Sequence, residues 1–137
     1  MKYRNLGKTG LKVSELGFGC GSIGGLMVRG DRKDQLRVVE RTIESGINYF
    51  DTARIYGDGQ SETNLGQVLK ELKPDVVIGT KVQLTAGDME RIEEATIESV
   101  EGSLKRLGLE CVDLIQLHNQ VGFTISQTRD GWALVIC

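Results

Sequence analysis

The sequence predicts an α/β protein with a parallel sheet. Near-continuous apolar segments, such as Val76–Ile78 and Val112–Leu117, alternate with longer segments whose apolar residues recur every three or four positions. The first pattern is typical of strands buried on both faces, and the second of amphipathic helices that cover them. Three of these strands end on a polar residue, namely Asp51, Lys81 and His118. Each of these residues is separated from the next by about the length of one βα unit with its loops.

The chain begins with a pattern typical of a β-hairpin. Residues 3–6 and 11–13 flank the turn sequence Gly7-Lys8-Thr9-Gly10, so we expect residues 1–13 to form a hairpin that closes one end of the fold. The first strand of the sheet follows, and the glycine-rich segment from Gly19 to Gly25 forms its loop.

Three helices are expected between the strands of the sheet. They run over residues 31–45, 61–73 and about 88–107. Asp31 or Asp34 caps the first helix, and Ser61 caps the second. Gly46 and Gly108 follow the first and third helices, at the position where a left-handed residue commonly ends a helix.

Four polar side chains form the candidate catalytic site. Asp51, Lys81 and His118 end the second, third and fourth strands, and Tyr56 lies on the loop after the second. Each has an ordinary structural explanation, as a turn cap, a solvated charge, a buried imidazole and a packing group, respectively. Independent structural uses are not expected to place all four at the strand ends, which is where barrel sites form.

This arrangement predicts a parallel (β/α)8 fold of the TIM-barrel type in incomplete form. A barrel of this type takes about 250 residues, and 137 residues hold about four βα units. We expect one domain over residues 1–137, with a hairpin at 1–13, βα units at 14–119 and an irregular tail at 120–137. An open four-stranded sheet exposes the edges of its first and fourth strands. We therefore expect the chain to associate through these edges, with itself or another half-barrel, or to be a fragment of a longer enzyme.

Composition argues against several classes of function. The chain is 39% hydrophobic and 26% charged, with a net charge of −2, which is typical of a globular domain and gives no basic surface for nucleic acid. No apolar run approaches the roughly 20 residues of a membrane span, and the N-terminus lacks a signal-peptide core. We therefore expect no membrane partner and a cytoplasmic location. Cys20, Cys111 and Cys137 lack metal-ligand spacing and His118 is the only histidine, so no metal site is expected.

The segment Gly19-x-Gly21-x-x-Gly24 also matches the fingerprint of a Rossmann dinucleotide site, with Asp51 at the end of the next strand. In that fingerprint the last glycine lies in the first turn of a helix, whose amide dipoles meet the pyrophosphate. Here residues 26–30 would have to be crossed before a helix begins, so the loop is too long. This interpretation ranks third.

The motifs around the candidate site resemble those of the aldo-keto reductase family. The matching segments are Phe50-Asp51-Thr52-Ala53 with Tyr56-Gly57, Ser61-Glu62 with Leu65-Gly66, Gly79-Thr80-Lys81, Ser103-Leu104 with Leu107-Gly108, and Val112-Asp113-Leu114 with Leu117-His118. The resemblance covers residues 3–119 in the family's order. It implies a catalytic tetrad of Asp51, Tyr56, Lys81 and His118, an NADP(H) cofactor and a small-molecule carbonyl substrate. It also implies cofactor contacts from Gly21, Ser22, Asp51 and Asn119.

The implied chemistry assigns a role to each member of the tetrad. Reduction of a carbonyl by hydride leaves an oxyanion that must receive a proton, and Tyr56 is the expected donor. A phenol is a weak acid at neutral pH, and a nearby ammonium strengthens it by stabilising the phenolate. Lys81 would supply this charge, Asp51 would hold Lys81 in place, and His118 would orient the substrate oxygen.

The leading hypothesis is therefore an NADP(H)-dependent oxidoreductase that reduces aldehydes or ketones to alcohols, here in an incomplete form with reduced or no activity. The alternative is a non-catalytic, aldo-keto reductase-like interaction or regulatory protein. A Rossmann-type dehydrogenase fragment is the third hypothesis.

Overall fold

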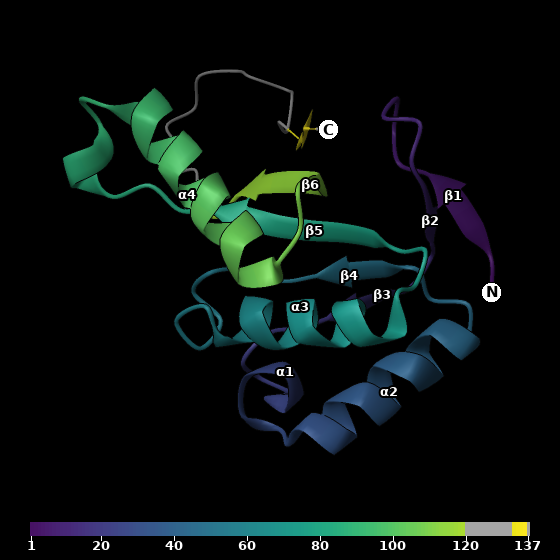
Figure 1. Cartoon of the computed structure of the whole chain (residues 1–137). Coiled ribbons are helices and arrows are strands. Elements are labelled where there is room, and N and C mark those ends of the chain that lie inside the picture. The colour runs from purple at the N-terminus through teal and green to yellow at the C-terminus, as the bar shows by residue number, and fades with distance from the viewer. Residues whose placement is uncertain (120–132, 137) are drawn as a thin grey trace.

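The chain forms one sheet with helices packed against it, together with a separate two-stranded hairpin (Figure 1). The computed structural model describes residues 1–119 and 133–136. The hairpin pairs β1 (Tyr3–Asn5) with β2 (Lys12–Ser14) antiparallel, as the sequence predicts. The sheet contains β3 (Gly17–Gly19), β4 (Tyr49–Asp51), β5 (Val77–Val82), β6 (Val112–Leu117) and β7 (Ala133–Ile136), and the helices are α1 (Leu26–Arg29), α2 (Arg32–Glu44), α3 (Gln60–Leu72) and α4 (Ile92–Leu107) with the short 3₁₀-helix η1 (Ala86–Asp88).

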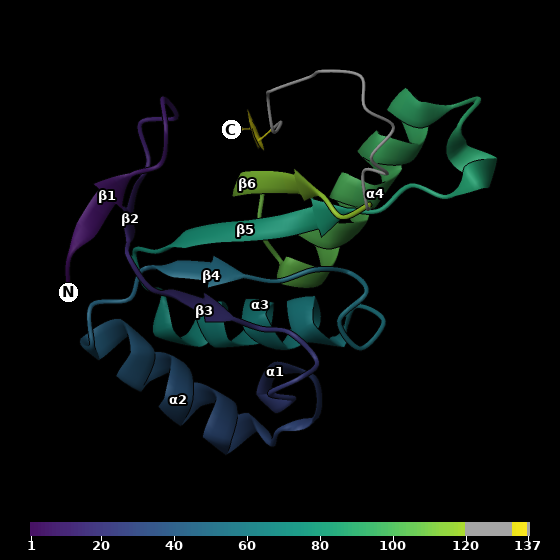
Figure 2. The same ribbon diagram turned by 180° about the vertical axis from the view of Figure 1, so that it is seen from behind.

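The order of the strands is that of a singly wound barrel. Strands β3 to β6 are parallel and lie side by side in chain order. Helices α3 and α4 lie in front of the strands in Figure 1 and behind them in Figure 2, so both cover the same face. A Rossmann sheet instead reverses its strand order at the cofactor crevice. The predicted parallel α/β sheet of barrel type is therefore confirmed.

One argument used against the Rossmann fold was wrong. Helix α1 begins at Leu26, directly after Gly25, which has a left-handed φ of 69°. The glycine-rich loop is thus followed at once by a helical turn, and the expected long crossing over residues 26–30 does not exist. The strand order, rather than the length of this loop, distinguishes the two folds.

The ends of the helices agree with the predictions in most places. Asp31 caps α2 by accepting a hydrogen bond from the amide of Asp34 at 2.8 Å. Gly46 follows α2 with a φ of 83°, and Gly108 ends α4 with a φ of 66°. Ser61 does not cap α3, because the helix begins one residue earlier, after Gly59. Helix α4 begins at Ile92, later than the expected start near Asp88, which is instead the last residue of η1.

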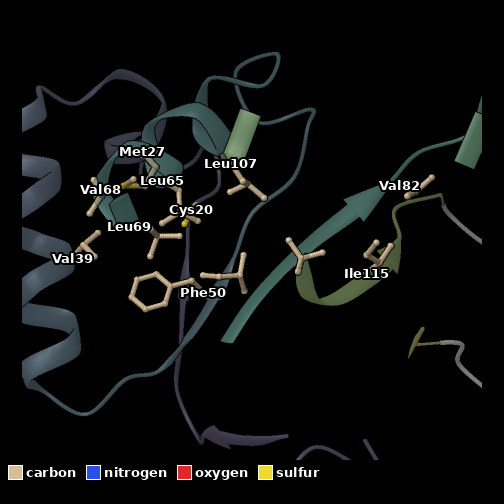
Figure 3. Packing of buried hydrophobic residues seen from close by; sticks show 12 residues of the cluster. Cys20, Met27, Val39, Phe50, Leu65, Val68, Leu69, Val82, Leu107 and Ile115 are labelled. Carbon is tan, nitrogen blue, oxygen red and sulfur yellow. The ribbon is translucent and has the colours of Figure 1, made fainter. Parts of the chain in front are cut away.

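The hydrophobic core lies between the sheet and the helices. Figure 3 shows side chains of β4, α2 and α3 pointing toward one another. The cluster consists of Cys20, Met27, Val39, Phe50, Leu65, Val68, Leu69, Ile78, Val82, Leu107, Val112 and Ile115. Each large apolar side chain buried in this way contributes about 1.5–3 kcal/mol. Because successive residues of a strand point to opposite faces, the burial of Phe50 among the helices turns Tyr49 and Asp51 toward the other face of the sheet.

A buried ion pair joins three elements behind the site. The side chain of Glu62 in α3 is completely buried. It accepts hydrogen bonds from the Thr80 hydroxyl of β5 and from Arg106 Nε of α4, each at 2.6 Å. Since Thr80 directly precedes Lys81, this network fixes the strand that carries the candidate lysine against both helices.

The carboxyl-terminal residues differ from the expected irregular tail. Residues 133–136 form β7, which pairs antiparallel with β6, whereas the rest of the expected tail lies outside the described residues. The expectation that the fourth parallel strand has an unpaired outer edge was therefore wrong, because the amide and carbonyl groups of β7 pair with that edge. Of the two edges through which self-association was predicted, only the outer edge of β3 lies at the border of the described sheet next to a parallel strand.

Two further classes of feature are missing from the described residues 1–119 and 133–136. None of their helices has both the length and the hydropathy of a membrane span. Three or more His, Cys, Asp or Glu side chains do not gather there in a way that would hold a metal ion.

Candidate active site

The fold brings the four candidate catalytic residues together at one end of the sheet. Strands β3 to β6 point in the same direction (Figure 2), so their carboxyl ends share one face. Asp51 is the last residue of β4, Lys81 lies near the end of β5, and His118 directly follows β6. Tyr56 lies between β4 and α3, on the loop held by hydrogen bonds from the Tyr56 amide to Ala53 O and from the Ser61 amide to Tyr56 O, both at 3.1 Å.

Lys81 makes two strong polar contacts. Its Nζ donates to Asp51 Oδ2 at 2.6 Å and to the main-chain oxygen of Thr52 at 2.8 Å. The side chain of Lys81 is 10% exposed and that of Asp51 is 28% exposed. A nearly buried ammonium is stable only when paired in this way. The carboxylate therefore holds the charge of Lys81 at a fixed position.

The aromatic rings of Tyr56 and His118 lie next to this ion pair. Lys81 Nζ is 5.0 Å from the centre of the Tyr56 ring. The centres of the Tyr56 and His118 rings are 5.7 Å apart, with the planes nearly perpendicular at 89°. The amide of His118 donates to Val82 O at 2.7 Å, which extends the pairing of β5 with β6 up to the histidine.

The electrostatic surroundings favour a neutral His118. Its pKa is lowered from the usual value, first by burial and second by the positive charge of Lys81, whereas Asp51 acts in the opposite direction. A neutral imidazole carries one N–H donor and one acceptor. His118 can therefore donate a hydrogen bond to an oxygen above the site without adding a second cation beside Lys81.

The residues expected to contact a cofactor lie around the same end of the sheet. Gly21 is against Tyr56, since a Cβ at this position would lie 3.9 Å from the tyrosine ring. Ser22 follows it on the loop after β3 and is exposed. Asn119 exchanges two side-chain hydrogen bonds with the main chain of Leu84, at 2.8 and 2.7 Å. An amide group has two N–H donors and two lone pairs on oxygen, and the two bonds to Leu84 use one of each.

Two residues close to the tetrad were missed by the sequence analysis. Gln116 Nε2 donates to Asp51 Oδ1 at 3.2 Å and to the Tyr49 hydroxyl at 3.0 Å. The Tyr49 hydroxyl also lies 3.3 Å from Asp51 Oδ1, as donor. Gln116 is a polar residue in a largely apolar strand, two positions before His118, and this was the signal that could have identified it.

Known proteins similar to this chain are aldo-keto reductases and related subunits. The model of the Aldo/keto reductase family matches residues 15–124. The chain is 36% identical over 125 residues to aldo-keto reductase YhdN of Bacillus subtilis, which covers 86% of the chain and 38% of that protein. It is also 36% identical over 124 residues to a probable voltage-gated potassium channel subunit beta of Arabidopsis thaliana, covering 86% of the chain and 37% of the subunit.

Solved structures give the same result. The holo form of aldo-keto reductase AKR11C1 from Bacillus halodurans matches with a TM-score of 0.68 and 38% identity, over 85% of the chain and 40% of that protein. An aldo/keto reductase from Klebsiella pneumoniae in complex with NADP and acetate matches with a TM-score of 0.62 and 27% identity. This match covers 79% of the chain and 36% of that protein. The chain thus spans less than half the length of these relatives. Its topology, its motifs and its similarity to these proteins show that it belongs to the aldo/keto reductase family.

Proposed function

We propose that this chain supplies the tetrad of an NADP(H)-dependent oxidoreductase that reduces aldehydes or ketones to alcohols. The observation that carries the proposal is the position of Lys81 Nζ, which contacts Asp51 Oδ2 at 2.6 Å and lies 5.0 Å from the centre of the Tyr56 ring. An ammonium held next to the Tyr56 ring balances the negative charge that the site gains when Tyr56 gives up its proton.

The residues fit a role in carbonyl reduction. Tyr56 donates its hydroxyl proton to the oxygen of the reduced carbonyl, and Lys81 stabilises the phenolate that remains. Asp51 holds the Lys81 ammonium in place. His118, neutral at pH 7, hydrogen-bonds the substrate oxygen and orients it toward Tyr56.

The surroundings of the tetrad also fit a nicotinamide cofactor. Gly21 has no side chain, so a ligand can approach its main chain closely beside the Tyr56 ring. Ser22 offers an exposed hydroxyl, and among the described residues Asn119 keeps one donor and one lone pair beyond its bonds to Leu84. When bound, NADPH supplies the hydride for the reaction. A relative from Klebsiella pneumoniae was solved with NADP, which supports this choice of cofactor.

The test is an NADPH titration of the purified 137-residue chain, followed by assays of NADPH oxidation with small aldehydes and ketones. We expect saturable binding and carbonyl-dependent oxidation. Since the chain spans 38% of the Bacillus subtilis relative, we expect slower turnover than that of a complete barrel. A folded chain that binds no NADPH would contradict the proposal.

A regulatory function is the second candidate. It is favoured by the similarity to a probable potassium channel subunit beta. Substitution of Tyr56 by Phe separates the two functions, because it should remove turnover and leave the binding of a partner protein intact.

Self-association remains part of the proposal, now through the outer edge of β3. An unpaired strand edge presents main-chain donors and acceptors to another chain. Sedimentation should show a dimer or larger species, and a stable monomer at all concentrations would contradict this.

A further inference from the structure

Tyr49 and Gln116 surround the one carboxylate oxygen of Asp51 that does not contact Lys81. Asp51 Oδ1 accepts from Gln116 Nε2 at 3.2 Å and from the Tyr49 hydroxyl at 3.3 Å. Gln116 also donates to the Tyr49 oxygen at 3.0 Å, which closes a triangle of hydrogen bonds. Asp51 Oδ2 is left for Lys81 Nζ at 2.6 Å. Each oxygen of this carboxylate therefore has its own partners.

The sheet is built so that the Tyr49 ring can reach across it. Tyr49 and Asp51 are two positions apart in β4 and share a face, whereas Gln116 lies in β6, beyond β5. A Cβ on Gly79 in β5 would lie 2.9 Å from the Tyr49 hydroxyl oxygen, and a Cβ on Gly17 in β3 would lie 2.8 Å from Tyr49 Cδ1. Glycine in both neighbouring strands thus leaves room for the ring.

We propose that Tyr49 and Gln116 are positioning residues that fix the Asp51 carboxylate, so that Asp51 holds Lys81 at the distance from Tyr56 that proton transfer needs. This inference rests on the proposed reductase function. The terminal torsion of an aspartate is broad, and this side chain is 28% exposed. Without the two donors, the carboxylate is free to turn toward water, and Lys81 Nζ is then held only by its hydrogen bond to Thr52 O.

The protonation of Tyr49 supports this role. The pKa of Tyr49 is raised to about 12, mainly by burial and secondly by the negative charge of Asp51. The hydroxyl of Tyr49 therefore stays a donor at neutral pH. A residue that only tied β4 to β6 would affect stability and leave kcat of the folded chain unchanged.

The first test is kinetic and uses the double variant Tyr49→Phe/Gln116→Leu, which keeps both side-chain volumes. We expect kcat to fall by about ten- to a hundredfold with KM for the carbonyl unchanged, because a misplaced catalytic group slows the chemical step. This split between kcat and KM is the readout that a residue acting only on stability would not give. Tyr3→Phe is the matched control, since the Tyr3 hydroxyl bonds Gly46 O at 2.8 Å, away from the site. Wild-type kcat in the folded double variant would overturn the inference.

The second test needs no turnover. Tyrosine ring carbons labelled with ¹³C report the titration of Tyr49 by NMR in the folded chain, with Tyr3 as internal control. Asp51→Asn should lower the pKa of Tyr49 from about 12, and Gln116→Leu should raise it further. An unchanged titration of Tyr49 in Asp51→Asn would overturn the inference. A chain that shows these shifts but no carbonyl reduction would support the positioning of Asp51 and contradict the reductase function instead.

Discussion

Arg106 is predicted to be essential for stability, because a buried carboxylate depends on it. The side chain of Glu62 is 0% exposed and that of Arg106 is 27% exposed. Glu62 Oε2 accepts from Arg106 Nε and Glu62 Oε1 from the Thr80 hydroxyl, each at 2.6 Å. Arg106→Met removes the only positive charge among these contacts and leaves the carboxylate with a neutral hydroxyl as its partner.

The size of the effect follows from this geometry. A hydrogen bond to a charged group contributes about 1.5–3 kcal/mol to stability. Loss of one partner of a buried ion pair costs more, about 3–5 kcal/mol, because the remaining charge stays buried without compensation. A domain is stable by about 5–15 kcal/mol in total. Arg106→Met should therefore remove a large share of the stability and loosen α4 from β5, the strand of Lys81.

The assay is urea unfolding at neutral pH, followed by circular dichroism. The matched control is Arg37→Met, since Arg37 pairs with Asp34 at 2.7 Å on the surface, with 72% and 44% of the side chains exposed. Exposed pairs of this kind contribute under about 1 kcal/mol. The double variant Glu62→Gln/Arg106→Met should lose less free energy of unfolding than the two single variants lose in sum. If Arg106→Met unfolds within about 1 kcal/mol of the wild type, the reasoning is refuted.

Two further predictions concern packing and alkaline stability. Gly66→Ala should lower the melting temperature, because the added Cβ would clash with the main-chain oxygen of Leu107 and overpacking costs about 1–3 kcal/mol. Gly87→Ala, whose Cβ would lie 3.7 Å from the Thr85 hydroxyl oxygen, is the control and should melt no lower than the wild type. The pKa of the Cys20 thiol is raised from 9.0 to about 12, mainly by burial and secondly by the Asp51 carboxylate. The folded state therefore keeps a proton that the unfolded state loses above pH 9. The thiol should then lower the stability by about 1.4 kcal/mol per pH unit in this window. Tyr49, whose pKa is also raised to about 12, adds to the loss at higher pH, so urea unfolding of Cys20→Ala should lack only the part of the slope that comes from Cys20.

The sheet and the positions of the tetrad could be predicted because they depend on local patterns. Apolar runs that end on Asp51, Lys81 and His118 identify strands, and parallel strands bring their carboxyl ends to one face whatever the rest of the chain does. Helix ends such as Asp31 and Gly46 follow from single residues with a strong positional preference.

The remaining features depend on partners that are distant in sequence. Glu62 looked like an acid in the first turn of a helix, and its burial requires Arg106, which is 44 positions away. The contact between Tyr49 and Gln116 joins residues 67 positions apart, and it exists because Gly79 between them has no side chain. Such contacts are set by the packing of several elements, which no local pattern records.

The strand β7 was missed for a similar reason. Residues 133–136 form a short apolar segment without a helical or alternating pattern, so the sequence assigned it no partner. Its partner is the edge of β6, which is available only after the parallel sheet has formed.

The most direct test of the proposed chemistry compares carbonyl-dependent NADPH oxidation by the wild-type chain and by Tyr56→Phe, with NADPH binding measured in both. The variant lacks only the hydroxyl oxygen that would donate the proton. We expect kcat to fall by about 10²–10⁴-fold while the affinity for NADPH stays the same. Equal turnover by Tyr56→Phe and the wild type would contradict the role of Tyr56 as proton donor.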